Sequence, residues 1–168
     1  MPSLKLNYPH QLGQAEAVNY GSLEYHPQDA EIRYFLMQFV QLHYARQRAT
    51  VRENYARSLY FLDGRLASAI IENDKKNKII ENFLVGTGEE IEVNVDNVSI
   101  EDLRRSPYRA TVDFEKVYYT PADHLELRRE KYIANFVFVV KDHVSNTMIP
   151  VNPLGLTITY FREDQAFQ

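Results

Sequence analysis

The chain has 168 residues, of which 45% are hydrophobic and 25% are charged, and its formal net charge is −4 at pH 7. This length fits one domain with residues to spare for a linker. The negative charge argues against a nucleic-acid binder, whose affinity depends on neutralising phosphates, and the absence of cysteine excludes disulfides, thiol catalysis and cysteine-based metal sites.

Residues 1–28 show no sustained apolar period and are interrupted by prolines and glycines, which predicts an extended lead-in or linker. The folded domain is then expected over residues 29–168. It opens with an amphipathic helix from Asp29 to about Arg48, because apolar residues recur there at helical spacing. A second face of this helix is unusually apolar for a surface in water: Tyr34, Met37, Gln41 and Tyr44. Two interpretations stay open for that face, a wide core surface and a self-association contact.

Three shorter helices are predicted to follow. Thr50 and Glu53 have the spacing of a capping box, in which Thr50 is the N-cap of a helix running to about Leu62. Asp63 and Gly64 are expected to stop that helix. The remaining helical segments are a third helix over residues 65–73, a polar break over 74–78 and a short fourth helix over 79–84.

After Gly86-Thr87-Gly88 the apolar period changes from 3.6 to 2, which predicts strands. This glycine pair precedes a strand and not a helix, so it cannot offer a helix N-terminus to a phosphate. The third strand is almost continuously apolar from Tyr132 to Val140, which predicts cover on both faces. In the last strand Tyr160 is expected to point inward and Phe161 outward. The strands are predicted at residues 90–96, 109–120, 124–141 and 156–161.

Helices followed by antiparallel strands indicate an α+β fold, in which a curved sheet of about four strands carries the helices on one face. A corner, Asn152-Pro153-Leu154-Gly155, leads into the last strand. Pro153 fixes its own φ and biases Asn152 away from helical angles. Gly155 can adopt backbone angles closed to other residues. The corner is therefore predicted to be a rigid turn that sets the register of the last strand.

No residue pattern predicts catalysis. The five histidines are scattered and none has the spacing of a helical metal pair; His43, on the helix stripe, is interpreted as a core or boundary histidine. Asp113 and Glu115 share a strand face with Arg109 and Thr111, so the alternation turns their carboxylates outward. We predict no catalytic residue, no metal ligand and no cofactor, and a protein that is not an enzyme.

The order of these features resembles a known family. The first helix reads Ile32-Arg33-Tyr34-Phe35-Leu36-Met37-Gln38-Phe39-Val40, the second contains Val51-Arg52-Glu53-Asn54-Tyr55, and Asn-Pro-x-Gly precedes the last strand. Together they are similar to the periplasmic domain of the TrbF-like, VirB-type (VirB-eight-like) inner-membrane subunit of type IV secretion and conjugation systems. The resemblance covers about residues 29–164.

That resemblance implies an NTF2-like cone and a structural scaffold of the secretion machine. It implies a periplasmic domain of a Gram-negative bacterium, held at the inner membrane by a single-pass anchor helix absent from this chain. The partners it implies are a second copy, in a weak homodimer, and other type IV secretion subunits, with no direct contact to nucleic acid. The candidate self-association face is Tyr34, Met37, Gln41 and Tyr44, and the family's assembly motif falls on Asn152, Pro153 and Gly155. The alternative is an NTF2-like ligand-binding domain or enzyme with a pocket between sheet and helices.

Overall fold

The computed structural model describes residues 28–167. The predicted lead-in over residues 1–28 lies outside the described residues, apart from Gln28. No helix in the described part of the chain combines the length and the hydrophobicity needed to cross a membrane.

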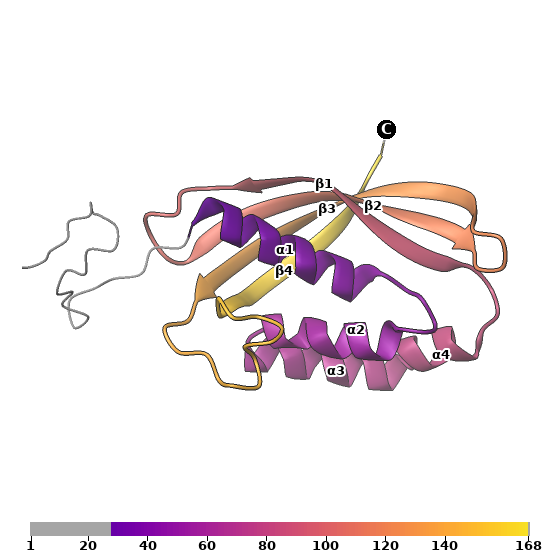
Figure 1. The fold of residues 1–168 in the computed structure, drawn as a ribbon, viewed down its shortest axis with the longest axis horizontal. Coiled ribbons are helices and arrows are strands. Elements are labelled where there is room, and N and C mark those ends of the chain that lie inside the picture. Colours follow the sequence, from indigo (N-terminus) through magenta and orange to yellow (C-terminus); the bar gives the residue numbers. More distant parts are fainter. Residues whose placement is uncertain (1–27, 168) are drawn as a thin grey trace, which may run out of the picture.

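The described residues form helices followed by one antiparallel sheet, which confirms the α+β prediction (Figure 1). The strands lie side by side in chain order, β1-β2-β3-β4, and each pairs antiparallel with the next. The helical segments are α1 (Asp29–Tyr44), α2 (Val51–Ser58), the 3-10 turn η1 (Leu59–Phe61), α3 (Gly64–Asn77) and α4 (Ile79–Val85). The strands are β1 (Glu90–Ile100), β2 (Tyr108–Thr120), β3 (Leu125–Val140) and β4 (Leu156–Ala166).

The helices cover one face of the sheet, and α1 lies against it (Figure 1). The inner stripe of α1 is fully buried at Ile32, Leu36, Phe39 and Val40. Phe39 lies at the centre of the core, with its ring 5.8 Å from that of Phe136 and 5.3 Å from that of Phe161. The predicted amphipathic helix is therefore the element that closes the core over the sheet.

Helix α1 ends at Tyr44 and not near Arg48. The reason is a backbone bridge to β1, in which Arg46 N donates to Ile91 O (2.9 Å) and Ile91 N donates to Arg46 O (2.8 Å). Because the N–H and C=O groups of Arg46 are both hydrogen-bonded to a strand, they cannot form the hydrogen bonds of a helix. The predicted capping box at Thr50 is also wrong: α2 does start at Val51, but the Thr50 side chain makes no cap hydrogen bond.

Helix α3 is longer than predicted and runs through the expected polar break. The preceding helix does not run to Leu62 and is not stopped by Asp63 and Gly64 as predicted, because α2 ends at Ser58 and the 3-10 turn η1 follows to Phe61. Asp63 is instead the N-cap of α3, and its side chain accepts a hydrogen bond from Leu66 N (2.8 Å). Lys75 and Lys76 lie in the last turn, where positive charge suits the helix dipole. The helix ends at Asn77, because the next residue, Lys78, has a φ of +53°. The charged run is thus the exposed end of a helix and not a break.

Two predictions about the strands are corrected by the structure. The apolar run of β3 is not covered on both faces, because Ala134, Phe136 and Phe138 are buried whereas Ile133 is exposed. In β4, Val137 pairs with Tyr160 and Phe138 with Ile158, which leaves an extra residue, Thr159, in a bulge. A bulge reverses the alternation beyond it. Phe161 therefore packs on the core and Tyr160 is 52% exposed, the opposite of the prediction.

Candidate assembly surfaces

The corner before β4 is organised by the side chain of Asn152, which is fully buried. Its Nδ2 donates to Leu156 O (2.8 Å) and to Tyr60 O (3.2 Å), and its Oδ1 accepts from Leu156 N (3.1 Å). Because a buried amide requires such partners, only a side chain with both a donor and an acceptor fits this position. Asn152 therefore joins the corner to η1 and to the first residue of β4.

Gly155 is needed for two separate reasons. Its φ is +73°, in the left-handed region that side chains disfavour, and a Cβ placed there would lie 2.8 Å from Val144 Cγ2. Its carbonyl oxygen accepts hydrogen bonds from Lys141 N and Thr157 Oγ1, both at 3.0 Å. These contacts hold the end of β3 against the start of β4, as expected for a turn that sets strand register.

Pro153 lies on the outer side of the same corner and is exposed. Tyr60, whose carbonyl binds Asn152, has an exposed side chain, and so does Ile149. We refer to Tyr60, Ile149 and Pro153 as the corner surface. The Asn-Pro-x-Gly motif thus has two halves: Asn152 and Gly155 hold the fold together, and Pro153 faces solvent.

The candidate self-association face on α1 is divided in the same way. Tyr34 is 55% exposed, and Met37 and Gln41 are half-buried at the surface of the helix. Tyr44 is only 7% exposed and stacks on Phe114 of β2, with ring centroids 5.1 Å apart. The last turn of α1 reaches the sheet, so the structure moves Tyr44 into the core and leaves Tyr34, Met37 and Gln41 as the accessible face. We call these three residues the α1 face.

A groove of about 310 Å³ borders this face between α1 and β1. Gln38, Gln41 and Leu42 line its helical side, and Glu92 and Asn94 line its strand side. Gln41 is the residue that the groove and the α1 face share. The accessible side of α1 is therefore not a flat helix surface but continues into a groove along β1 that both polar and apolar side chains line.

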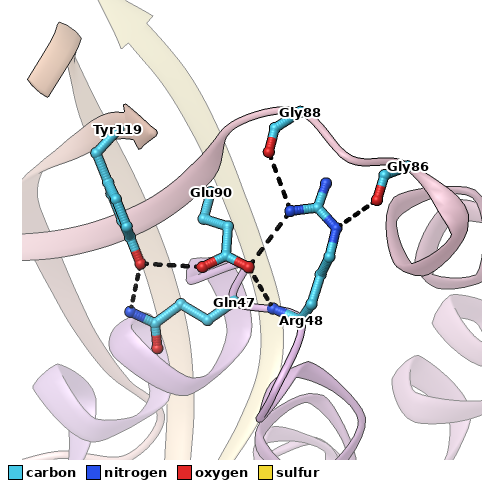
Figure 2. A network of polar contacts seen from close by, with 6 residues as sticks. All are labelled: Gln47, Arg48, Gly86, Gly88, Glu90 and Tyr119. Carbon is cyan, nitrogen blue, oxygen red and sulfur yellow. Dashed lines mark hydrogen bonds and ion pairs between the residues drawn. The ribbon is translucent and has the colours of Figure 1, made fainter. Parts of the chain in front are cut away.

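A polar network joins the loop after α1 to the start of the sheet (Figure 2). The guanidinium of Arg48 donates to Gly86 O (2.6 Å) and Gly88 O (3.0 Å) and lies 3.3 Å from the Glu90 carboxylate. The Arg48 backbone N also donates to Glu90 (2.9 Å). The two glycines thus present carbonyl oxygens to a cation, the opposite polarity of a phosphate loop.

The same network continues from Glu90 to Tyr119 and Gln47 (Figure 2). The Tyr119 hydroxyl donates to Glu90 Oε1 (3.3 Å) and accepts from Gln47 Nε2 (2.9 Å). Burial is the main cause that raises the pKa of Tyr119; the hydrogen bond from Gln47 opposes it and the nearby carboxylates add to it, so the hydroxyl keeps the proton that it donates. Sequence spacing does not reveal this network, because its members are far apart in the chain and are brought together only by the fold.

The inner face of the sheet carries an ion pair between β2 and β4 that sequence spacing also does not reveal. Lys116 Nζ lies 3.3 Å from Glu163 Oε2 and 4.1 Å from the ring centroid of Tyr132. Tyr44 completes the aromatic surroundings of this ammonium at 5.1 Å, and burial raises the pKa of the Tyr44 hydroxyl. Glu163 lies beyond the predicted end of the last strand, which is why it was not assigned to the sheet.

The candidate acid–base residues lie where the alternation predicted. Asp113 and Glu115 are on the outer face, away from the helices, and Glu115 accepts a hydrogen bond from Arg129 (3.0 Å). The inward carboxylate is instead Glu163, and Lys116 neutralises it. Among residues 28–167, no group of three or more histidine, aspartate or glutamate side chains is placed to hold a metal ion.

His43 is a core histidine, as its position on the helix stripe predicted. Its ring stacks between Phe39 (5.0 Å) and Tyr55 (5.3 Å), and its Nδ1 lies 2.9 Å from Ser58 Oγ. Burial is the main cause that lowers the pKa of His43 to about 3, with Arg46 and Lys116 adding to it. The imidazole is therefore neutral in the folded protein at physiological pH.

The comparison with known structures agrees with this geometry. The soluble domain of TrwG from Bartonella grahamii is 18% identical, with a TM-score of 0.71 over 84% of this chain and 96% of that one. VirB8 of Agrobacterium tumefaciens is 12% identical, with a TM-score of 0.68 over 86% of this chain and 99% of that one. A TraE protein in complex with 2-(2-furyl)isonicotinic acid is 20% identical, with a TM-score of 0.67 over 83% of this chain and 98% of that one. These similarities confirm the predicted NTF2-like α+β fold.

The family of this chain follows from the match to a protein-family model. No curated protein sequence matches the chain. The model of the VirB8 protein family matches residues 9–166, nearly the whole length. The chain therefore belongs to the VirB8 family and is an assembly component of type IV secretion systems.

Proposed function

We propose that this chain is a non-enzymatic scaffold subunit that acts through two surfaces, the α1 face for self-association and the corner surface for other secretion subunits. The observation that carries the proposal is the division of both regions into a buried and an exposed side. Side chains that must hold the fold point inward, and large apolar side chains such as Tyr34 remain in water. An exposed aromatic residue beside half-buried neighbours is typical of the centre of a protein contact.

The α1 face suits a weak homodimer. Tyr34 packs edge-on against Phe35, with ring centroids 5.0 Å apart, so an exposed ring is held in one position before association. Pre-ordered aromatic side chains lose little entropy on binding. The half-buried Met37 beside it offers an adaptable apolar contact. The small size of this patch predicts an association that needs high protein concentration.

Sedimentation equilibrium over a range of concentrations tests the homodimer. We expect the parent domain to associate reversibly, and Tyr34→Asp or Met37→Arg to weaken its association about tenfold or more. The matched control for Tyr34→Asp is Val85→Asp, which places the same charge on a highly exposed apolar residue of α4. A domain that is monomeric at every concentration, or that associates equally well in all four proteins, would contradict the role of the α1 face.

The corner surface is the proposed contact for other subunits of the machine. Ile149 and Pro153 are exposed on a loop that Asn152 and Gly155 hold rigid, and Asn152 also joins this loop to Tyr60 of η1. A rigid surface presents a defined shape to a partner. Co-purification of tagged protein from envelope extracts, compared between parent and Ile149→Asp, tests this contact. Loss of secretion subunits from the variant, with the monomer fold intact, is the expected result.

The family relationship also supports a location. We propose that the domain lies in the periplasm, on the outer side of the inner membrane, held by a single anchor helix of the native gene product. Alkaline phosphatase fused after Gln168 of that gene product is then expected to be active in intact cells. A fusion that is inactive, while a cytoplasmic reporter at the same position is active, would place the domain on the other side.

A further inference from the structure

The outer edge of β4 is only partly covered. At its start, Leu62 forms a parallel bridge with Ile158, and Asp63 N donates to Ile158 O (3.0 Å). Beyond the Thr159 bulge, among the described residues, β4 has backbone hydrogen bonds to β3 but to no segment on its other side. The open edge therefore spans residues 160–166. Figure 1 shows this end of β4 running away from α2 and α3 toward the C-terminus.

An open strand edge is a template for another strand. We propose that this edge pairs antiparallel with the same edge of a second copy, about a twofold axis, to give one continuous sheet across both copies. This contact goes beyond the proposed function, because it lies on β4 and not on the α1 face. Two different twofold contacts on one chain permit assemblies larger than a dimer.

The length of the open edge determines the register. A twofold pairing that uses all of residues 160–166 places the midpoint, Glu163, opposite Glu163 of the second copy. In an antiparallel pair, the residue numbers of any two opposed residues add up to the same value, which here is twice 163. Arg162 therefore faces Asp164 of the second copy, and Tyr160 faces Ala166 of the second copy.

The charges on the outer face fit this register. Arg162 and Asp164 lie on the outer face of β4, both exposed, and within one chain their side chains are 3.0 Å apart. In the paired edges each guanidinium gains a second carboxylate, and the symmetry produces this contact twice. Opposite charges that face each other across strands stabilise the pairing. On the inner face, Lys116 already neutralises Glu163 in each copy at 3.3 Å, which reduces the repulsion at the midpoint.

The absence of cysteine permits a direct test of the register. Directly opposed Cα atoms lie about 4.5–5.5 Å apart in antiparallel strands, which is within the range that a disulfide can span. Mild oxidation of Arg162→Cys mixed with Asp164→Cys is expected to give a disulfide-linked heterodimer in high yield. Each variant by itself should give little, because its own cysteine in the second copy is about 8 Å away.

The experiment is done with Tyr34→Asp added to every protein, so that the α1 face does not bring copies together. A mixture of Arg162→Cys with Arg57→Cys, which is exposed on α2, gives the background yield. A yield well above that background supports the pairing. A yield equal to background overturns it, and neither result depends on whether the α1 face is itself a contact.

A charge exchange gives a second, independent measurement. In the same background, Arg162→Asp should weaken association about tenfold, since the introduced carboxylate would face Asp164 of the second copy, twice in each dimer. Adding Asp164→Arg to that protein should restore association, because the exchanged charges are again complementary. An Arg162→Asp protein that associates as well as or better than its parent overturns the proposal and shows that the charges of β4 keep the edge unpaired.

Discussion

The corner before β4 and the helix α1 are both candidate assembly surfaces, yet they differ in how residues are divided between fold and surface. In the corner, the residues that define the sequence motif, Asn152 and Gly155, are buried, and only Pro153 faces solvent. In α1, the residues of the predicted face are mostly accessible, and only Tyr44 is buried. The corner motif, whose backbone angles require particular residues, therefore mainly stabilises the fold. A helix, in contrast, can pack one side on the core and present the opposite side to a partner.

This difference has a consequence for mutagenesis. A substitution at Asn152 or Gly155 changes the stability of the domain, so any loss of assembly that follows is indirect. Substitutions at Pro153 or Tyr34 leave the buried contacts in place and report on association itself.

Asn152→Ala is expected to lower the free energy of unfolding by about 3 kcal/mol, since it leaves Leu156 N, Leu156 O and Tyr60 O without their partner. For a domain of this size that corresponds to a fall in melting temperature of roughly 6–12 °C. Calorimetry or chemical denaturation measures it. A melting temperature close to that of the parent would show that the buried half of the corner does not hold the fold.

Gly155→Ala is expected to cost about 2 kcal/mol, because alanine is strained at a φ of +73° and its Cβ would contact Val144 Cγ2. Adding Val144→Ala removes the contact but not the backbone strain, so it should recover only part of the loss. Gly64→Ala is the matched control, since a Cβ there meets no atom within 4 Å. Equal stability of the Gly155 and Gly64 variants would contradict this account of the corner.

His43 gives the buried side of α1 a pH dependence. Its pKa is about 3 when folded and about 6.5 when unfolded, so the unfolded chain binds a proton that the folded protein does not. The stability present above pH 6.5 is therefore lost as the pH falls, by about 2 kcal/mol between pH 7 and pH 5. His43→Gln should reduce the difference in unfolding free energy between these two pH values by that amount.

The control for this measurement is His143→Gln, since His143 is exposed. The carboxylates of the protein contribute equally to all three proteins, so only the change in pH dependence matters. If His43→Gln and the parent lose the same stability over this pH range, the imidazole is not the group that couples folding to protons.

Pro153→Ala is expected to have the smallest effect on the fold, within about 0.5 kcal/mol in unfolding free energy, since the side chain is exposed. Co-purification with other secretion subunits should nevertheless weaken. If association falls only in proportion to stability, Pro153 contributes to the fold alone, and the proposal that it forms part of a contact surface is contradicted.

Local sequence was sufficient for much of this protein. The 3.6-residue period over Asp29–Tyr44 and the period of 2 in the strands predicted the α+β fold, because the buried face of a helix or strand is set by side-chain spacing. The special backbone of the Asn152–Gly155 corner was also predictable, since proline and glycine act through covalent geometry. The resemblance to the family followed from the order of these same segments.

The tertiary structure decided what depends on residues far apart in the chain. The bridge between Arg46 and Ile91 ends α1, and the Thr159 bulge exchanges the directions of Tyr160 and Phe161. Likewise, nothing near Asn152 in sequence reveals that its amide binds Tyr60 O. Hydrogen bonds and strand register between residues far apart in the chain depend on which elements pack together. A local sequence pattern determines the structure of its own helix or strand, but not which other elements that helix or strand contacts.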